Sequence, residues 1–154
     1  MPFKKLFPAL VLTSLLCGCN TLTMNYTCNP AGATLYQNDG QNLGLCPNAV
    51  NYGLTAEDKQ RGYLNIPGTT AKWVSGASSY TTPTITVNLA NGHNQSLNFE
   101  RPRDVAGYDI DANYALKLQR NAIMAQQAQE QADTNALMLQ QQQIEIQQLQ
   151  QQKK

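Results

Sequence analysis

The C-terminal tract of the chain, from Asp111 to Lys154, contains no proline and no glycine. It consists mostly of Ala, Leu, Gln, Met and Glu, which are all good helix formers. Asp109 or Asp111 is suited to cap the start of a helix. We therefore predict one continuous Ala/Gln-rich helix over residues 109–152. At 1.5 Å per residue it would be roughly 60 Å long, which is more than a small globular domain can cover.

Residues recur every seven positions along this tract, in three sets: Leu116, Ile123, Glu130, Leu137 and Ile144; Leu118, Ala125, Ala132, Leu139 and Ile146; Ala115, Ala122, Gln129, Ala136 and Gln143. The second and third sets together occupy the two core positions of a coiled-coil heptad, and the first lies on nearly the opposite face. We expect Tyr114 to Leu118 to pack on the preceding part of the chain. Beyond Ala125 three interpretations stay open: a self-associating coiled coil, a helix docked on a partner, and a solvated helix.

The N-terminus has the three-part layout of an export signal. Lys4 and Lys5 precede an apolar stretch from Leu6 to Leu16, and small residues follow it. A membrane-spanning helix needs about 20 predominantly apolar residues, and this run is roughly half as long. The segment is therefore expected to target the protein for export and not to span a membrane.

The window Leu16-Cys17-Gly18-Cys19 resembles the bacterial lipoprotein signal, which has Leu three residues before the lipidated cysteine and Gly directly before it. The resemblance implies a signal peptide at residues 1–18, a lipid on Cys19, and a lipidated N-terminus and tether at residues 19–27. By resemblance to enterobacterial sorting, Asp after the cysteine would retain the protein on the inner membrane. Asn20 stands there instead, which favours the outer membrane.

Removal of the signal and of the C-terminal helix leaves roughly 90 residues for a core, enough for one small domain. The formal net charge of the 154-residue chain is +1, and loss of Lys4 and Lys5 would bring it to −1. No polybasic patch remains in the mature chain. Nucleic acid is therefore not an expected partner.

Cys28 and Cys46 remain as a pair when Cys17 leaves with the signal and Cys19 carries the lipid. In an oxidising compartment two such thiols form a disulfide. A metal site and a redox pair are the competing interpretations. Neither has support, because His93 is the only histidine and the two cysteines do not form a C-x-x-C motif. We predict a structural disulfide, with no metal and no cofactor.

The segment from Cys28 to Asp104 has the pattern of short strands joined by turns. Ala33–Tyr36 alternates as a strand, and the turn signal Asn38-Asp39-Gly40 follows it. A hairpin is therefore expected there. Thr55 is suited to cap a brief helical turn.

A second hairpin is predicted between Thr84–Leu89 and Ser96–Phe99. Both segments alternate cleanly with their apolar residues on one face, and Asn91-Gly92 lies between them. His93 would lie on this turn in solvent. The polar segment from Asn20 to Thr27 is expected to be a tether or a first edge strand.

The order of turn-forming residues resembles the PEGA domain, a small β module of cell-envelope proteins. The residues that carry the resemblance are Pro30, Gly32, Ala33, Tyr36, Gly40, Gly44 and Pro47. It implies a small antiparallel sheet or sandwich at residues 28–104, so that the whole chain belongs to the α+β class. The family usually has Ser or Thr where Cys28 and Cys46 stand, so a disulfide would replace side-chain hydrogen bonds here.

An enzyme would need a nucleophile with a base, two facing carboxylates or a metal set. The sequence offers few residues for any of these arrangements, so we expect a non-enzymatic envelope lipoprotein. Its β module would lie near the membrane, and its helical arm would self-associate or contact an envelope protein or peptidoglycan.

A module that binds envelope glycan is the alternative function. Trp73, Tyr63, Tyr80 and Tyr52 would be its stacking rings, although a lone Trp in so small a domain belongs more often to the core. The charged run from Glu100 to Asp104 is expected to form surface ion pairs, with an anion site as its alternative.

Overall fold

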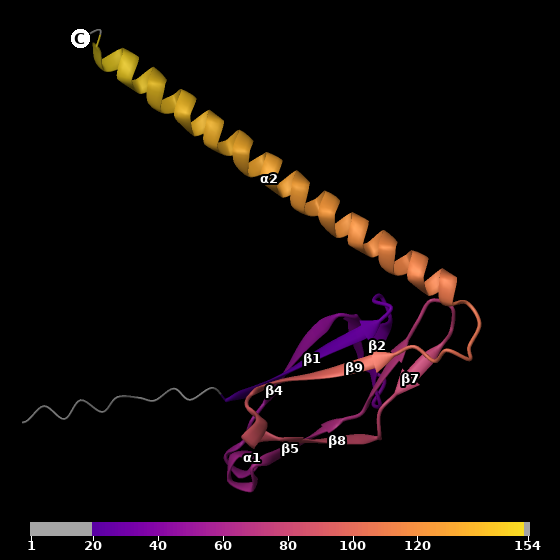
Figure 1. Ribbon diagram of the computed structural model, residues 1–154. Coiled ribbons are helices and arrows are strands. Elements are labelled where there is room, and N and C mark those ends of the chain that lie inside the picture. The colour runs from indigo at the N-terminus through magenta and orange to yellow at the C-terminus, as the bar shows by residue number, and fades with distance from the viewer. Residues whose placement is uncertain (1–19, 153–154) are drawn as a thin grey trace, which may run out of the picture.

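The computed structural model describes residues 20–152, which form a β module followed by one long helix (Figure 1). The elements are β1 (Thr21–Asn29), β2 (Thr34–Gln37), β3 (Asn42–Leu45), β4 (Asn48–Gly53), α1 (Ala56–Arg61), β5 (Tyr63–Pro67), β6 (Thr69–Lys72), β7 (Ser78–Tyr80), β8 (Thr84–Asn88), the 3-10 helix η1 (Leu89–Asn91), β9 (Asn94–Glu100) and α2 (Tyr108–Gln152). The predicted α+β class and the long C-terminal helix are confirmed. Cys19 and the predicted signal lie outside the described residues.

Three small sheets make up the β module, with strand orders β4-β1-β9, β3-β2-β6-β7 and β5-β8. Five of the six strand pairs are antiparallel. The sixth joins β1 to β9 in parallel, with Met24 beside Gln95 and Cys28 beside Phe99. The small module is therefore antiparallel as expected, except at the β1–β9 pair, which joins its first strand to its last.

β1 occupies most of the segment for which a tether was predicted. It is the middle strand of its sheet, with β4 on one side and β9 on the other, so it is not an edge strand either. Leu22, Met24 and Tyr26 are buried and alternate with more exposed polar residues. Burial of each such side chain contributes roughly 1.5–3 kcal/mol, which explains why the segment joins the core. The module therefore begins at Thr21 and not at Cys28.

The hairpin predicted between β8 and β9 is wrong, although both strands exist. β8 pairs with β5, where Ile66 lies beside Ile85, and β9 pairs with β1. Between them the Asn88 side chain accepts a hydrogen bond from the Ala90 N–H and caps η1. This turn separates the two strands, so that β8 pairs with β5 and β9 pairs with β1. Alternation correctly identified the strands, but it does not specify the partner of a strand.

The first predicted hairpin and the disulfide are confirmed. β2 and β3 pair around Gly40, whose φ of 89° is one that glycine adopts readily. The Cys28–Cys46 disulfide ties β1 to the residue that follows β3. The capped helical turn is also confirmed, because Thr55 and Asp58 form a reciprocal capping box at the start of α1.

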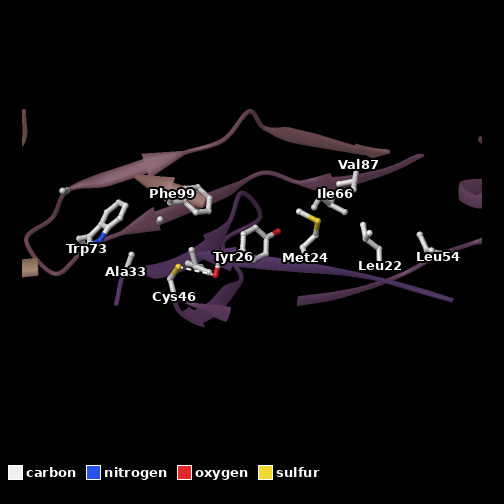
Figure 2. Packing of buried hydrophobic residues seen from close by; sticks show 13 residues of the cluster. Leu22, Met24, Tyr26, Ala33, Cys46, Leu54, Ile66, Trp73, Val87 and Phe99 are labelled. Carbon is white, nitrogen blue, oxygen red and sulfur yellow. Dashed lines mark hydrogen bonds between the residues drawn. The ribbon is translucent and has the colours of Figure 1, made fainter. Parts of the chain in front are cut away.

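The core lies between the sheets, along the inward face of β1 (Figure 2). Leu54 lies at one end of this row of side chains and Trp73 at the other. Trp73 is only 3 % exposed, and its indole N–H donates to the Pro30 carbonyl at 2.8 Å. The interpretation of Trp73 as a core residue is therefore confirmed.

Candidate interaction surface

The start of α2 is fixed to the β module by a buried arginine. Arg101 directly follows β9 and is 4 % exposed. A guanidinium group has five N–H donors, and here each bond goes to an acceptor in the same chain: Asp111 Oδ2 (2.5 Å), Ser75 Oγ (3.2 Å) and the carbonyls of Pro102 (2.9 Å), Val105 (2.8 Å) and Ala106 (2.7 Å). The connection from β9 to α2 is thus wrapped around one side chain.

Asp111 completes this arrangement from the first turn of α2. Its carboxylate accepts the Ser75 N–H at 2.9 Å and the Ser75 hydroxyl at 2.6 Å, in addition to the bond from Arg101. Burial raises the pKa of the Asp111 carboxyl, but the Ser75 hydrogen bonds and the Arg101 charge outweigh that effect and hold the pKa below its usual range. We call Ser75, Arg101 and Asp111 the Arg101 cluster. It joins the β6–β7 turn, the end of β9 and the start of α2.

Two expectations for these residues are wrong. Arg101 forms neither a surface ion pair nor an anion site, because its donors are used within the chain. Asp111 lies in the first helical turn but bonds Ser75 and Arg101 instead of serving as the N-cap. The one local signal for burial was register, since Arg101 continues the inward face of β9 after Leu97 and Phe99.

The next two turns of α2 pack on the module at Gly32. Tyr114 and Leu118 are half-buried there, which agrees with the expected packing of residues 114–118. A Cβ added to Gly32 would lie 2.8 Å from Leu118 Cδ1 and 3.0 Å from Tyr114 Cδ1. Glycine is therefore required for this close approach of turn and helix.

Beside this contact lies an open apolar groove of about 610 Å³. One wall comes from the two proline turns that flank the disulfide, and the other comes from α2. The lining residues are Pro30, Ala31, Cys46, Pro47, Ala112, Ala115, Leu116, Leu118, Gln119 and Ala122. Almost all of them are apolar or small, so the groove suits an apolar side chain or a helix and not a charged ligand.

Beyond the groove, α2 projects away from the β module (Figure 1). Every side chain from residue 121 to residue 148 is exposed. Several large apolar residues are among them, each about half exposed or more: Ile123, Met124, Leu137, Met138, Leu139, Ile144 and Ile146. Exposed apolar surface of this extent, on a helical segment whose side chains do not pack on the β module, is typical of an interaction surface.

The rings proposed for glycan stacking do not form such a surface. Trp73 is buried, and the Tyr52 hydroxyl is bonded to the hydroxyl of Tyr26 and to the side-chain N–H of Gln37. Tyr63 is 36 % exposed, with the Arg61 guanidinium 5.2 Å from its ring centroid. Tyr80 remains open, at 76 % exposed. The glycan hypothesis thus loses the ring on which it mainly depended.

Within residues 20–152, no three His, Cys, Asp or Glu side chains are gathered as a metal site. None of the helices in this described range has the length and apolar character needed to cross a membrane.

No known protein family, curated protein or solved structure matches the chain. The resemblances to the lipoprotein signal and to the PEGA domain therefore stay predictions from the sequence.

Replacement of Asp111 by Asn should lower the free energy of unfolding at pH 7 by about 3 kcal/mol, because the Arg101 charge stays buried without its partner. An unfolded Asp has a pKa of about 3.9 and the folded group has a lower one, so this contribution is complete above that pH and is lost as the pH falls through the folded pKa. Urea unfolding from pH 7 to pH 2.5 should show the two proteins converging at the acid end. The exposed Asp109→Asn variant is the control, and a pH-independent difference would contradict the assignment.

Gly32→Ala should destabilise the protein more than Gly40→Ala. Both glycines have similar positive φ values, 93° and 89°, but a Cβ at Gly40 meets nothing within 4 Å. The excess for Gly32→Ala therefore measures the collision with Leu118, and we expect about 1–3 kcal/mol by urea unfolding. Hydrogen exchange should also accelerate at residues 112–118 in Gly32→Ala alone. Equal effects of the two substitutions would show that the helix does not pack on this turn.

Proposed function

We propose that this protein is a lipid-anchored cell-envelope protein without enzymatic activity, in which α2 is an arm that contacts another protein chain. The observation that carries the proposal is the exposed length of α2, with large apolar side chains along residues 123–146. Isolated helices gain little stability from propensity alone, and most helical stability in proteins comes from packing of an apolar face. A partner that covers this face would supply that packing.

The support for an anchor comes from the window Leu16-Cys17-Gly18-Cys19. If Cys19 carries the lipid, only Asn20 separates it from β1, which starts at Thr21. The Asn20 carbonyl accepts the Leu54 N–H at 2.7 Å, so Asn20 is itself held by the module. The β module would then lie directly against the membrane surface, closer than a nine-residue tether would allow. An outer-membrane location is part of the proposal, because Asn follows the cysteine.

The anchor is tested by the full chain expressed in a bacterial host, with Cys19→Ser compared with Cys17→Ser. We expect Cys19→Ser to abolish lipid labelling and to move the protein out of the membrane fraction, since two or three acyl chains hold a protein stably and none would remain. Cys17→Ser should behave as the unaltered chain does. Membrane retention of Cys19→Ser, with unchanged labelling, would contradict lipidation.

The arm is tested by crosslinking with mass spectrometry in intact cells, using the full chain and a chain that ends at Ala125. The module and its contacts with α2 are complete before that residue, because the groove ends at Ala122. We expect the truncated chain to keep its disulfide and its membrane fraction but to lose the crosslinked species of the full chain. Retention of the same crosslinked species would place the contact on the β module instead.

A further inference from the structure

One face of α2 is free of charge along its whole projecting length. It is formed by residues spaced three and four apart, which we call the Ala/Gln seam: Ala115, Leu118, Ala122, Ala125, Gln129, Ala132, Ala136, Leu139, Gln143, Ile146 and Gln150. The charged residues of the helix after Tyr114 all lie outside it: Lys117, Arg120, Glu130, Asp133 and Glu145. Residues with this spacing lie on one side of a helix and form the contact strip of a coiled coil.

The groove and the Ala/Gln seam are one continuous surface. Ala115, Leu118 and Ala122 belong to both. At this end Leu118 already packs on Gly32, whereas Ala115 and Ala122 line the groove. A helix that lies along the seam from Ala122 onward would therefore reach the groove at the base of α2.

The opposite column of α2 is the only other apolar column of comparable length in the described helix, and it is interrupted. Between Ile123 and Leu137 it carries Glu130, whereas Asp133 lies at its edge, between this column and the Ala/Gln seam. In a symmetric contact through this column, the Glu130 carboxylates of the two copies would face each other, which is destabilising. The Ala/Gln seam has no such conflict.

We infer that the occupant of the groove and the Ala/Gln seam is α2 of a second copy of this chain, parallel and in register. The seam is complementary to itself. The alanines allow close approach, and Gln129, Gln143 and Gln150 carry amides that both donate and accept, so identical residues can pair across the contact. A polar residue at such a core position also favours one register.

The parallel direction rests on the proposed function. Two copies anchored through Cys19 in one membrane start from the same surface, so their helices point the same way.

The available area agrees with a stable pair. Residues 122–150 span roughly 42 Å of helix, and a contact strip about 10 Å wide on each copy gives roughly 840 Å² in total before the groove of each copy is added. A specific interface buries about 1,000 Å² or more. The three carboxylates after residue 121 lie outside the seam, and repulsion between those of the two copies is screened at physiological salt.

The register is tested in the full chain with Ala125→Cys on the seam and Gln127→Cys on the opposite face, both at exposed positions. Under mild oxidation of intact membranes, Ala125→Cys should give a disulfide-linked dimer and Gln127→Cys should give none above the level of the unaltered chain. In a fully overlapping antiparallel pair, residue 125 would lie about 20 Å or more from its counterpart, so a strong Ala125→Cys dimer supports the parallel arrangement. A dimer from Gln127→Cys alone would overturn the seam.

The energetics are tested by two double variants of identical composition, Gln129→Glu with Gln143→Glu on the seam, and Gln127→Glu with Gln141→Glu opposite to it. Sedimentation of the detergent-solubilised full chain should show dimerisation weakened at least tenfold by the seam pair, since like charges would face each other. The opposite pair should leave dimerisation unchanged. Equal effects would overturn the inference.

The inference and the proposed function fail in different ways. If Ala125→Cys gives no dimer but truncation after Ala125 still removes crosslinks to another protein, the second copy is excluded and the arm function stands. If Ala125→Cys gives no dimer and truncation after Ala125 removes no crosslink, both the inference and the proposed function are overturned.

Discussion

The guanidinium group of Arg101 is the single group on which the arrangement of this protein depends. The orientation of α2 relative to β9 would not be fixed if the connecting residues 101–107 were held only by their own backbone. Instead the connection folds around Arg101, whose five N–H groups reach three backbone carbonyls, Ser75 and Asp111. A buried arginine is tolerated only when its charge and donors are matched, so removal of one partner affects all the segments that meet there.

The parallel pairing of β1 with β9 gives this cluster its position. The backbone N–H of Arg101 continues the β1–β9 hydrogen-bond ladder by donating to the Asn29 carbonyl at 3.0 Å. Asn29 ends β1, and the disulfide at Cys28 ties the same end of the strand to Cys46. The helix base, the disulfide and the two proline turns are therefore assembled at one end of the module, and the groove is a consequence of their meeting.

Features encoded by neighbouring residues could be predicted from the sequence. The long helix follows from composition and the absence of Pro and Gly, and the β2–β3 hairpin follows from Asn38-Asp39-Gly40. The segment of β1 was predicted to be a tether or an edge strand, because it is short and most of its residues are polar, although Leu22, Met24 and Tyr26 alternate in it. The prediction that β8 pairs with β9 was wrong because alternation identifies the buried face of a strand and not its neighbouring strand.

The Arg101 cluster could not be predicted, since Ser75 lies 26 residues before Arg101 and Asp111 lies 10 after it. Those three residues become neighbours only when the sheets are assembled. Of the candidate interaction surface, the sequence predicted the apolar columns of α2 but not the groove. The heptad columns of α2 were found from spacing, whereas the groove arises from prolines and alanines that are distant in the chain.

The length of α2 also makes it a lever. Its hold on the module runs from Asp111 to Leu118, about 10 Å of helix axis, whereas about 50 Å of axis extends from Leu118 to Gln152. If the helix pivots at Asp111, a displacement of 1 Å at Leu118 would move the far tip by roughly 6 Å. The Arg101 cluster lies at this pivot, so its rigidity determines how far the C-terminal end of α2 can move.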